Sequence, residues 1–411
     1  MKKTNIDWIG NVPDDWETYK IGSLFKSRNE KVSDTDYAPL SVSKGGIVPQ
    51  MENVAKSDAN DNRKLVLKND FVINSRSDRK QSCGIAHLDG SVSLINTVLY
   101  TDAENLISPS YTNLVLKNYG FAEEFYRWGH GIVADLWTTR WQEMKSIVLP
   151  LPDVKKQTKI LHFVKKKLSE VDNLIANQQA QIEKLKEYKQ SVITEAVTKG
   201  LDKNAPMKDS GILHIGNVPG HWSVKKHKYI FKKQKSICEK YVGESILSLT
   251  MNGVIVKDLN NPTGKMPTTF DGYQYVEKGN LLLCLFDIDV TPRCVGVIKN
   301  NGLTSPAYSQ YQIISGDNVT YFYYLLLALD FKKELLYLSK NLRSSLSDEL
   351  FGLIDTIVPP IDEQQQIVDY LDEKHVKIDK LITLKQEKIE KLQEYKKSLI
   401  YEYVTGKKEV V

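Results

Sequence analysis

Two long stretches of the chain repeat apolar residues with heptad spacing. Both begin just after prolines, and the segments 153–199 and 361–405 contain no proline or glycine. Such a pattern predicts two long helices whose apolar seams are buried against a partner helix. The predicted seam consists of Leu168, Val171, Ile175, Ile182, Leu185, Val192 and Ala196 in the first stretch and Ile378, Ile382, Ile389, Leu392 and Leu399 in the second. Gln178 with Lys385 and Lys189 with Lys396 interrupt the two seams at matching places.

The chain is an internal duplication. The segment Ile9–Pro13, followed by Trp16, is repeated as Ile215–Pro219, followed by Trp222. The segment Leu174–Thr198 aligns without a gap on Leu381–Thr405, 207 positions later, with identical residues at 15 of 25 positions. The central parts, roughly 50–140 and 255–345, barely align. A repeat of this size indicates duplication of a whole domain plus a helix, which predicts pseudo-twofold symmetry and antiparallel pairing of the two helices as a coiled coil.

The variable central parts mix strand and helix patterns. Residues 65–67, 71–74, 84–87, 281–286 and 295–298 are predicted as strands, and 121–128 and 321–337 as helices. The fold class is therefore α+β. We expect a first domain at 1–150, a helix at 151–199, a linker at 200–213, a second domain at 214–358 and a second helix at 359–411.

Composition is that of a folded protein and does not single out a partner. Apolar residues make up 41% and charged residues 26% of the chain, and the net charge is only +5. No apolar segment approaches the length of a membrane-spanning helix, so no membrane partner is expected. The four cysteines, Cys83, Cys238, Cys284 and Cys294, are widely spaced, which favours reduced thiols and a cytoplasmic location.

Motifs for catalysis or cofactor binding are missing from the sequence. It contains no phosphate-binding glycine loop, no Gly-x-Ser-x-Gly, no His-Glu-x-x-His and no Cys-x-x-Cys. The histidines that come nearest to a cluster, His214, His221 and His227, lack carboxylate or thiol companions, and we expect them to be exposed in loops and strands. The sequence predicts no catalytic residue, no metal site and no cofactor site.

Polar loops in the central parts carry side chains suited to DNA. The loop 75–81 joins two predicted strands and is rich in the Arg, Lys and Gln side chains that hydrogen-bond guanine and adenine in the major groove. The loop 287–293 is its counterpart in the second half. The candidate DNA-binding residues are Lys44, Arg76, Arg79, Lys80, Gln81, Arg140, Arg293, Asn341 and Arg343.

The repeated domain openings and exits resemble those of type I restriction specificity subunits. The openings are Ile9–Pro13 with Trp16, and 208–212 followed by Ile215–Pro219 with Trp222; the exits run from Val148 to Gln157 and from Val358 to Gln364. The resemblance spans the chain from Ile9 to Thr405. It departs at the first exit, where Lys155 and Lys156 stand in place of the acids that the family favours.

The resemblance implies a non-catalytic subunit of a DNA adenine methyltransferase and type I deoxyribonuclease. It implies two target-recognition domains, each recognising one half of a bipartite, asymmetric site in double-stranded DNA. The helices would set the gap and dock two methyltransferase subunits, and two restriction and translocation subunits would join for cleavage. S-adenosylmethionine, ATP and magnesium would be held by those partners, and no cofactor by this chain.

Two other classes of function remain open from the sequence. A coiled-coil scaffold that joins protein-binding domains would show the same repeated frame, and sequence-specific DNA binding with partner subunits would separate it from a specificity subunit. A self-contained methyltransferase or nuclease would turn over a labelled methyl donor or DNA without partners.

Overall fold

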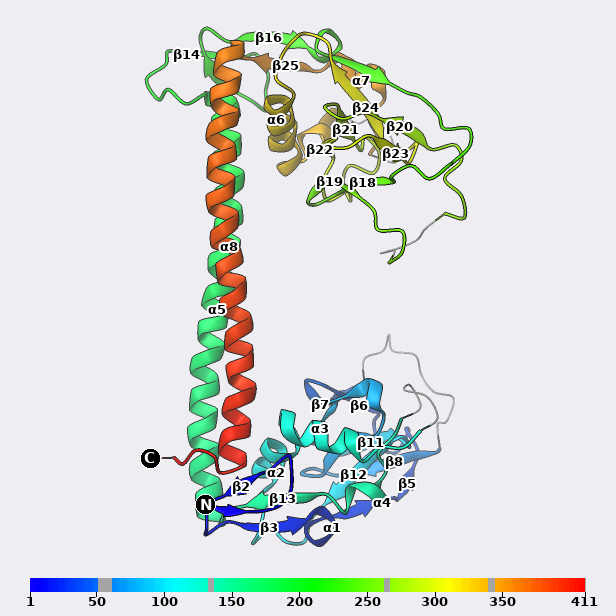
Figure 1. Ribbon diagram of the computed structural model, residues 1–411, viewed down its shortest axis with the longest axis vertical. Helices are drawn as coiled ribbons and strands as arrows, with labels where there is room; N and C mark the ends of the chain where they lie inside the picture. Colours follow the sequence, from blue (N-terminus) through cyan, green and yellow to red (C-terminus); the bar gives the residue numbers. More distant parts are fainter. Residues whose placement is uncertain (51–60, 132–136, 262–266, 339–343, 411) are drawn as a thin grey trace. The chain divides into compact units, whose positions relative to one another are not determined.

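The computed structural model divides the protein into two compact units. It describes residues 1–50, 61–131, 137–261, 267–338 and 344–410. The first unit comprises residues 1–179 together with 386–411, and the second comprises 180–385. Each unit therefore contains part of both long helices, α5 (Val154–Lys199) and α8 (Ile361–Val404), which Figure 1 labels together with many of the other elements.

The first unit is built on a four-stranded antiparallel sheet in the order β10-β9-β12-β4. A second sheet, β11-β8-β5, and the pairs β1-β2, β3-β13 and β6-β7 complete its strands. The bounds are β1 (Lys2–Lys3), β2 (Asn11–Val12), β3 (Glu17–Lys20), α1 (Ile21–Leu24), β4 (Lys26–Arg28), β5 (Lys31–Val32), β6 (Leu40–Ser43), β7 (Gly46–Pro49), β8 (Arg63–Val66), β9 (Phe71–Asn74), the 3-10 helix η1 (Ser77–Arg79), β10 (Cys83–Ile85), β11 (Gly90–Ser93), β12 (Asn96–Tyr100), α2 (Pro109–Leu116), α3 (Tyr119–Arg127), α4 (Trp141–Met144) and β13 (Val148–Leu151).

The second unit repeats this order of strands. Its four-stranded antiparallel sheet is β22-β21-β24-β17, and the pairs β14-β15, β16-β25, β18-β19 and β20-β23 accompany it. The bounds are β14 (Met207–Asp209), β15 (Asn217–Pro219), β16 (Ser223–Lys226), η3 (His227–Tyr229), β17 (Phe231–Gln234), β18 (Leu247–Thr250), β19 (Gly253–Val256), β20 (Gln274–Val276), β21 (Leu281–Leu283), β22 (Val295–Val297), β23 (Gly302–Thr304), β24 (Ser309–Ile313), α6 (Val319–Phe331), η4 (Glu334–Leu338), α7 (Asp348–Leu353) and β25 (Asp355–Val358).

The start of one long helix and the end of the other enter each hydrophobic core. Ile160 and Val164 of α5 lie in the first core with Leu399 and Val404 of α8. The second core takes Val192 and Val197 from α5 and Ile367 and Leu371 from α8. Chain segments far apart in sequence thus stabilise the same unit, because burial of this apolar surface is favourable only when both helix ends are in place.

The two helix segments within each unit run in opposite directions. In the first unit the ring of Phe163 lies 4.8 Å from that of Tyr403, and Lys396 forms an ion pair with Asp172. In the second unit Lys385 donates to Gln181, and Lys189 pairs with Asp379 at 2.7 Å. Rising residue numbers in α5 meet falling numbers in α8, and the two ion pairs correspond to each other under the 207-residue offset.

A buried glutamine fixes the first turn of each long helix. Gln157 accepts from the backbone N–H of Ser108 at 3.2 Å and donates to the carbonyl of Pro152 at 3.0 Å. Gln364, 207 positions later, accepts from the N–H of Asn318 at 2.8 Å and donates to Pro359 at 2.9 Å. Both side chains are fully buried. The amide group satisfies backbone groups that would otherwise be buried without a partner.

Each long helix also ends against the opening of a unit. Gly200 and Gly406 have φ of +71° and +69°, the left-handed conformation in which glycine commonly follows a helix. A Cβ on Gly200 would lie 3.3 Å from the Trp222 ring, and one on Gly406 would lie 2.3 Å from Pro13. The openings that repeat in the sequence are therefore the surfaces that receive the helix ends.

Two expectations from the sequence are wrong. The helix expected at 321–337 ends at Phe331, because Lys333 has φ of +52° and its ammonium group donates to Asp330 and to the carbonyl of Thr291. His227 was expected to be exposed but is fully buried, with its ring 4.9 Å from Phe231 and 4.5 Å from Phe351. Burial lowers the pKa of His227 to about 3, so this imidazole is neutral.

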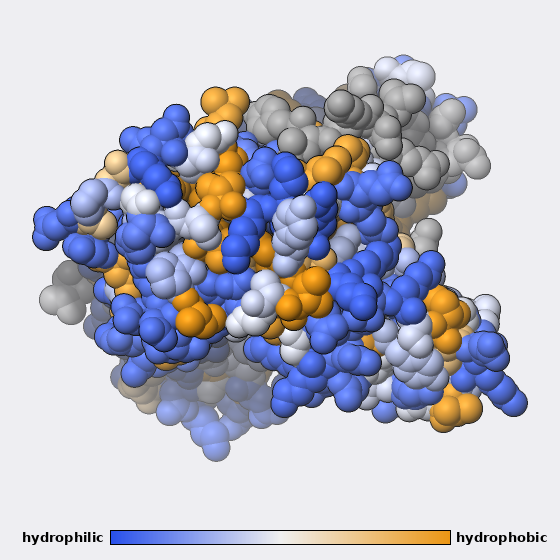
Figure 2. Space-filling view, turned by 90° about the horizontal axis from the view of Figure 1, so that it is seen from above, coloured by the Kyte–Doolittle hydropathy of each residue, from blue (hydrophilic) through white to orange (hydrophobic). Residues whose placement is uncertain are grey.

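The face of the molecule seen in Figure 2 is mostly hydrophilic. The face in Figure 2 shows apolar side chains in small groups among polar ones rather than as one broad patch. None of the helices in the described ranges has the length and apolar composition needed to cross a membrane.

Candidate nucleic-acid interface

The loop between β9 and β10 of the first unit is closed at its base by hydrogen bonds. The N–H of Asn74 donates to the carbonyl of Ser82 at 2.9 Å, and the Asn74 side chain accepts from the N–H of Arg76 at 3.0 Å. Gln81 adopts φ of +64° where the chain turns back. The polar residues 76–81 are thus held on a short, defined turn at the end of a buried sheet.

An aspartate lies between the two arginines of this loop. Nε of Arg76 is 3.1 Å from Oδ1 of Asp78, and Nε of Arg79 is 3.7 Å from Oδ2. The side chain of Arg79 is 66% exposed. Exposed pairs of this kind contribute little to stability, so their main effect is to orient the guanidinium groups.

Lys80 is held by helix α3. Its ammonium group lies 2.6 Å from Oε1 of Glu123 and 4.8 Å from the centre of the Tyr126 ring. Sequence patterns do not indicate these two α3 residues, because they are separated from Lys80 by more than forty positions and neither belongs to a motif. Lys80 is therefore fixed against α3, while Arg79 extends into solvent.

A second segment, residues 137–140, lies beside the loop. The N–H of Thr139 donates to the carbonyl of Ser75 at 2.9 Å, and the indole N–H of Trp137 donates to the carbonyl of Tyr126 at 2.9 Å. Arg140 follows directly and precedes α4, with its backbone N–H donating to Glu143 at 2.9 Å. The structure thus brings Arg140 into the same region as the 75–81 loop.

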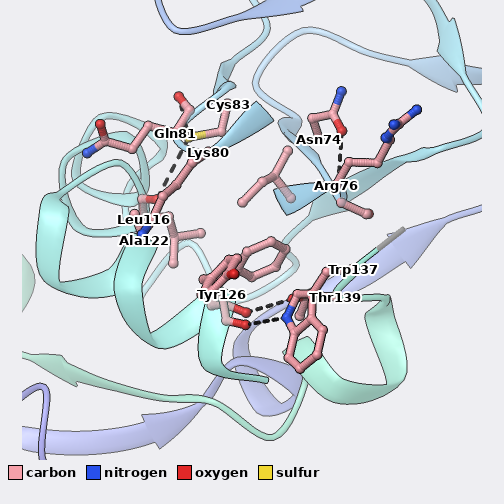
Figure 3. Close-up of a pocket in the computed structure, with 13 residues that line it drawn as sticks. Asn74, Arg76, Lys80, Gln81, Cys83, Leu116, Ala122, Tyr126, Trp137 and Thr139 are labelled. Carbon is pink, nitrogen blue, oxygen red and sulfur yellow. Dashed lines mark hydrogen bonds between the residues drawn. The ribbon is translucent and has the colours of Figure 1, made fainter. Parts of the chain in front are cut away.

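A small hollow of about 20 Å³ lies between these segments. Figure 3 shows Asn74 and Arg76 on one side of it, Lys80 and Gln81 on the other, and Tyr126 with Trp137 beneath. Cys83 also lines it, but burial raises the pKa of this thiol to about 12, so it is a neutral side chain rather than a nucleophile. The hollow combines aromatic faces with cationic and amide groups.

Lys44 lies in the turn of the β6-β7 hairpin and lines a second hollow, of about 280 Å³, together with Gln81. The hairpin packs closely on β10, since a Cβ on Gly84 would be 3.2 Å from the Cα of Gly46. Gln81 lines both hollows. The candidates of the first unit, predicted separately from the sequence, therefore gather on adjoining segments.

The second unit places Arg293 beside its own hairpin turn. Arg293 lines a hollow of about 270 Å³ with Thr250 and Met251 from the β18-β19 hairpin, and it donates to the hydroxyl of Tyr323 on α6 at 3.3 Å. Met251 stands 207 positions after Lys44. The candidates Asn341 and Arg343 lie outside the described residues.

Helix α6 fixes the strand next to Arg293. The buried carboxylate of Asp330 accepts from the backbone N–H of Cys294 at 2.7 Å and pairs with Lys333 at 2.8 Å. Burial raises the pKa values of both Cys284 and Cys294. Among the described residues, no group of three His, Cys, Asp or Glu side chains is placed to hold a metal ion.

The residues predicted for the helix seam all have reduced exposure. None of them is among the exposed positions of α5 or α8. The buried members are Val171, Ile182, Val192, Ala196, Ile378, Ile389 and Leu399, and the half-buried ones are Leu168, Ile175, Leu185, Ile382 and Leu392. Gln178, which interrupts the apolar pattern, is also buried.

Comparisons with curated proteins find relatives that are named as specificity subunits of type I restriction enzymes. No protein-family model matches the chain. A protein of Methanocaldococcus jannaschii, named provisionally as the type I restriction enzyme MjaX specificity subunit, is 23% identical over 99% of this chain and 96% of its own length. The type I restriction enzyme MjaVIII specificity subunit of the same organism is 26% identical over 64% of this chain and 62% of its own length.

Solved structures share the fold. The HsdS subunit from Thermoanaerobacter tengcongensis matches with a TM-score of 0.50 at 14% identity, over 96% of this chain and 98% of that one. A chain from a structure of the type I R-M system, which addresses complex assembly and conformational transition, matches with a TM-score of 0.65 at 12% identity over the same shares. The resemblance inferred from the repeated openings and exits is confirmed.

Proposed function

We propose that the chain is the sequence-specific DNA-recognition subunit of a type I restriction-modification complex. The observation that carries this proposal is a contrast within the molecule. The two units share strand order, buried glutamines and helix ends, whereas the loops beside the two hairpin turns differ in sequence. We call the shared strand order, buried glutamines and helix ends the frame of each unit. Equivalent frames suit two copies of one partner, and different loops suit two different half-sites.

In this proposal each unit recognises one half of a bipartite, asymmetric site in double-stranded DNA. In the first unit, Arg79 is exposed in the loop between β9 and β10, with Lys80, Gln81 and Lys44 nearby. The second offers Arg293, flanked by a hairpin turn that carries Met251 where the first has lysine. Guanidinium and amide groups on short, fixed loops are suited to hydrogen bonds with base edges.

The long helices form the spacer in this proposal. The opposed direction of α5 and α8 within each unit, the low exposure of the predicted seam and the two corresponding ion pairs support an antiparallel coiled coil with pseudo-twofold symmetry. The predicted division into a domain at 1–150, a helix at 151–199, a linker at 200–213, a domain at 214–358 and a helix at 359–411 is part of the same proposal.

Catalysis belongs to partners in this proposal. Two methyltransferase subunits dock on the repeated frame and supply S-adenosylmethionine, and two restriction and translocation subunits supply the ATP- and magnesium-dependent steps. The chain itself contributes recognition and spacing. The complex acts in the cytoplasm, where its DNA substrate lies.

The test is methylation-site sequencing in a host that lacks other adenine methylation. Cells expressing the chain with its methyltransferase subunit should carry methyl groups at one bipartite sequence with a fixed gap. Cells expressing either subunit alone serve as controls and should carry none. Methylation at the same site without this chain would show that sequence recognition lies elsewhere.

A further inference from the structure

The start of helix α5 has a basic stripe on its outer face. Lys155, Lys159, His162 and Lys166 follow one another at spacings of four, three and four residues, which places them on one side of the helix. All four are exposed. The buried residues of this segment, such as Ile160 and Val164, lie on the other side and enter the first core.

The start of helix α8 has the opposite charge at the same positions. Asp362, Gln366, Asp369 and Glu373 stand 207 positions after the four residues of the basic stripe, and all four are exposed. Residues 154–167 include six lysines and no acid, whereas 361–374 include five acids and one lysine. The charge is therefore inverted where the surrounding frame is repeated.

The inversion extends to the contact that ties each helix to its unit. Lys156 of α5 pairs with Asp15 in the first unit. At the corresponding place in the second unit, Glu363 lies 2.8 Å from Nε2 of His221 and accepts from the indole N–H of Trp222 at 3.0 Å. The same attachment is made with the acid on the helix instead of on the unit.

Helix stability does not account for the basic stripe. The first turn of a helix carries partial positive charge and favours acids, so the acidic start of α8 agrees with the helix dipole, whereas Lys155 in the first turn of α5 opposes it. Lys155 and Lys159 form no ion pair in the described part of the chain, and the carboxylate near Lys166 is that of Glu170, one turn further along α5. An exposed basic stripe with so little internal compensation suits an anionic surface of a partner.

We propose that the two docking positions for the methyltransferase subunits are electrostatically inequivalent, with the basic stripe of α5 in one and the acidic stripe of α8 in the other. This inference rests on the proposed function. Two copies of one subunit present the same charges to both positions, so only one stripe can be complementary. The two copies then bind in separate steps, one weakened by salt and the other maintained or strengthened.

The experiment measures the two binding steps of the full chain with its methyltransferase subunit. Mass photometry across about 0.05 to 0.5 M salt gives the 1:1 and 1:2 populations, over a range in which screening changes strongly. We expect one stepwise Kd to rise by about tenfold or more and the other not to rise. Equal salt dependence of the two steps would overturn the inference.

Stripe variants assign the steps. Replacing Lys155→Asp, Lys159→Gln and Lys166→Glu gives α5 the residues of α8 and should make the two steps alike, and so should Asp362→Lys, Gln366→Lys and Glu373→Lys in α8. Lys155→Arg, Lys159→Arg and Lys166→Arg keep the charge and should preserve the difference. Because every substituted position is exposed, thermal melts should show intact folding.

Two other outcomes are distinguishable. If the lysine-to-acid variant leaves both protein-binding steps unchanged but lowers the salt dependence of DNA binding, the basic stripe contacts DNA phosphates and the inference is wrong. If no methyltransferase subunit binds under any condition, the proposed function fails rather than the inequivalence of the two positions.

Discussion

The two units resemble each other where they hold the helices and differ where they face solvent. Gln157 and Gln364 make matching hydrogen bonds, and Gly200 and Gly406 end their helices against matching openings. The hairpin turn beside the candidate interface, by contrast, has Lys44 in one unit and Met251 in the other. Duplication has preserved the contacts that need complementary geometry in both copies, and has left the exposed loops to diverge.

Removing the buried glutamines should have the largest effect on stability. Gln157→Leu and Gln364→Leu each leave buried backbone groups without partners, which should cost about 2 to 4 kcal/mol. Hydrogen exchange should show the loss mainly in the unit that carries the variant, and losses of similar size in the two. The exposed neighbours Lys159→Leu and Gln366→Leu are controls and should change little. A large loss of stability in only one of the two variants would show that the two frames are not equivalent.

One arginine from each unit should separate the two units in DNA recognition. Arg79→Ala in the first unit and Arg293→Ala in the second should each cost about 1 to 3 kcal/mol of affinity if the side chain contacts a base. Each should relax specificity in one half-site only, measured by binding of the assembled complex to sites with single base changes. Arg79→Lys keeps the charge and tests for phosphate contact. Uniform weakening on all sequences would assign these residues to the phosphate backbone.

Acid should destabilise the second unit more than the first. Burial lowers the pKa of His227 to about 3, whereas an unfolded histidine titrates near 6.5. Below about pH 6.5 the unfolded state binds a proton that the folded state does not, so stability falls by about 1 kcal/mol per pH unit until the folded pKa is reached. The corresponding residue of the first unit is the buried Ile21, whose N–H donates to Ile147 as that of His227 donates to Ile354.

Exchange of these two residues sharpens the test. His227→Ile should remove the extra acid sensitivity of the second unit, and Ile21→His should introduce it into the first. Hydrogen exchange at pH 7, 6 and 5 follows both units in one sample. Acid sensitivity that remains in the second unit of the His227→Ile variant would place its cause in another group, of which His375 is the next candidate, because burial lowers its pKa to about 4.

The ion pairs between the helices should have the smallest effect. Lys189–Asp379 and Lys396–Asp172 are partly exposed, and a double-mutant cycle on either should give a coupling of about 0.5 kcal/mol or less that decreases in high salt. The two cycles should agree, because the pairs correspond to each other. A large coupling in one cycle alone would show that the helix contacts differ between the units.

Sequence patterns were sufficient to predict the two long helices, because the heptad spacing is a local signal and because Leu174–Thr198 repeats as Leu381–Thr405. They also located the polar loop between β9 and β10, whose contact with DNA stays a prediction. They could not show that Glu123 and Tyr126 hold Lys80, since that contact joins distant segments. The burial of His227 was missed because its surroundings, Phe231 and Phe351, come together only in the folded unit.

The central claim is that two independent readers of DNA sequence are separated by a helical spacer. It is tested most directly by methylation-site sequencing of a variant with four residues inserted after Gln181 in α5 and four after Lys388 in α8. Four residues add about 6 Å of helix and turn the seam by only about 40°. Two-residue insertions at the same places turn it much further and serve as the control that should lose assembly. The account predicts that both half-site sequences stay unchanged while the gap between them grows by one or two base pairs, about 3.4 Å each. An active four-residue variant that methylates the original site with the original gap would contradict it.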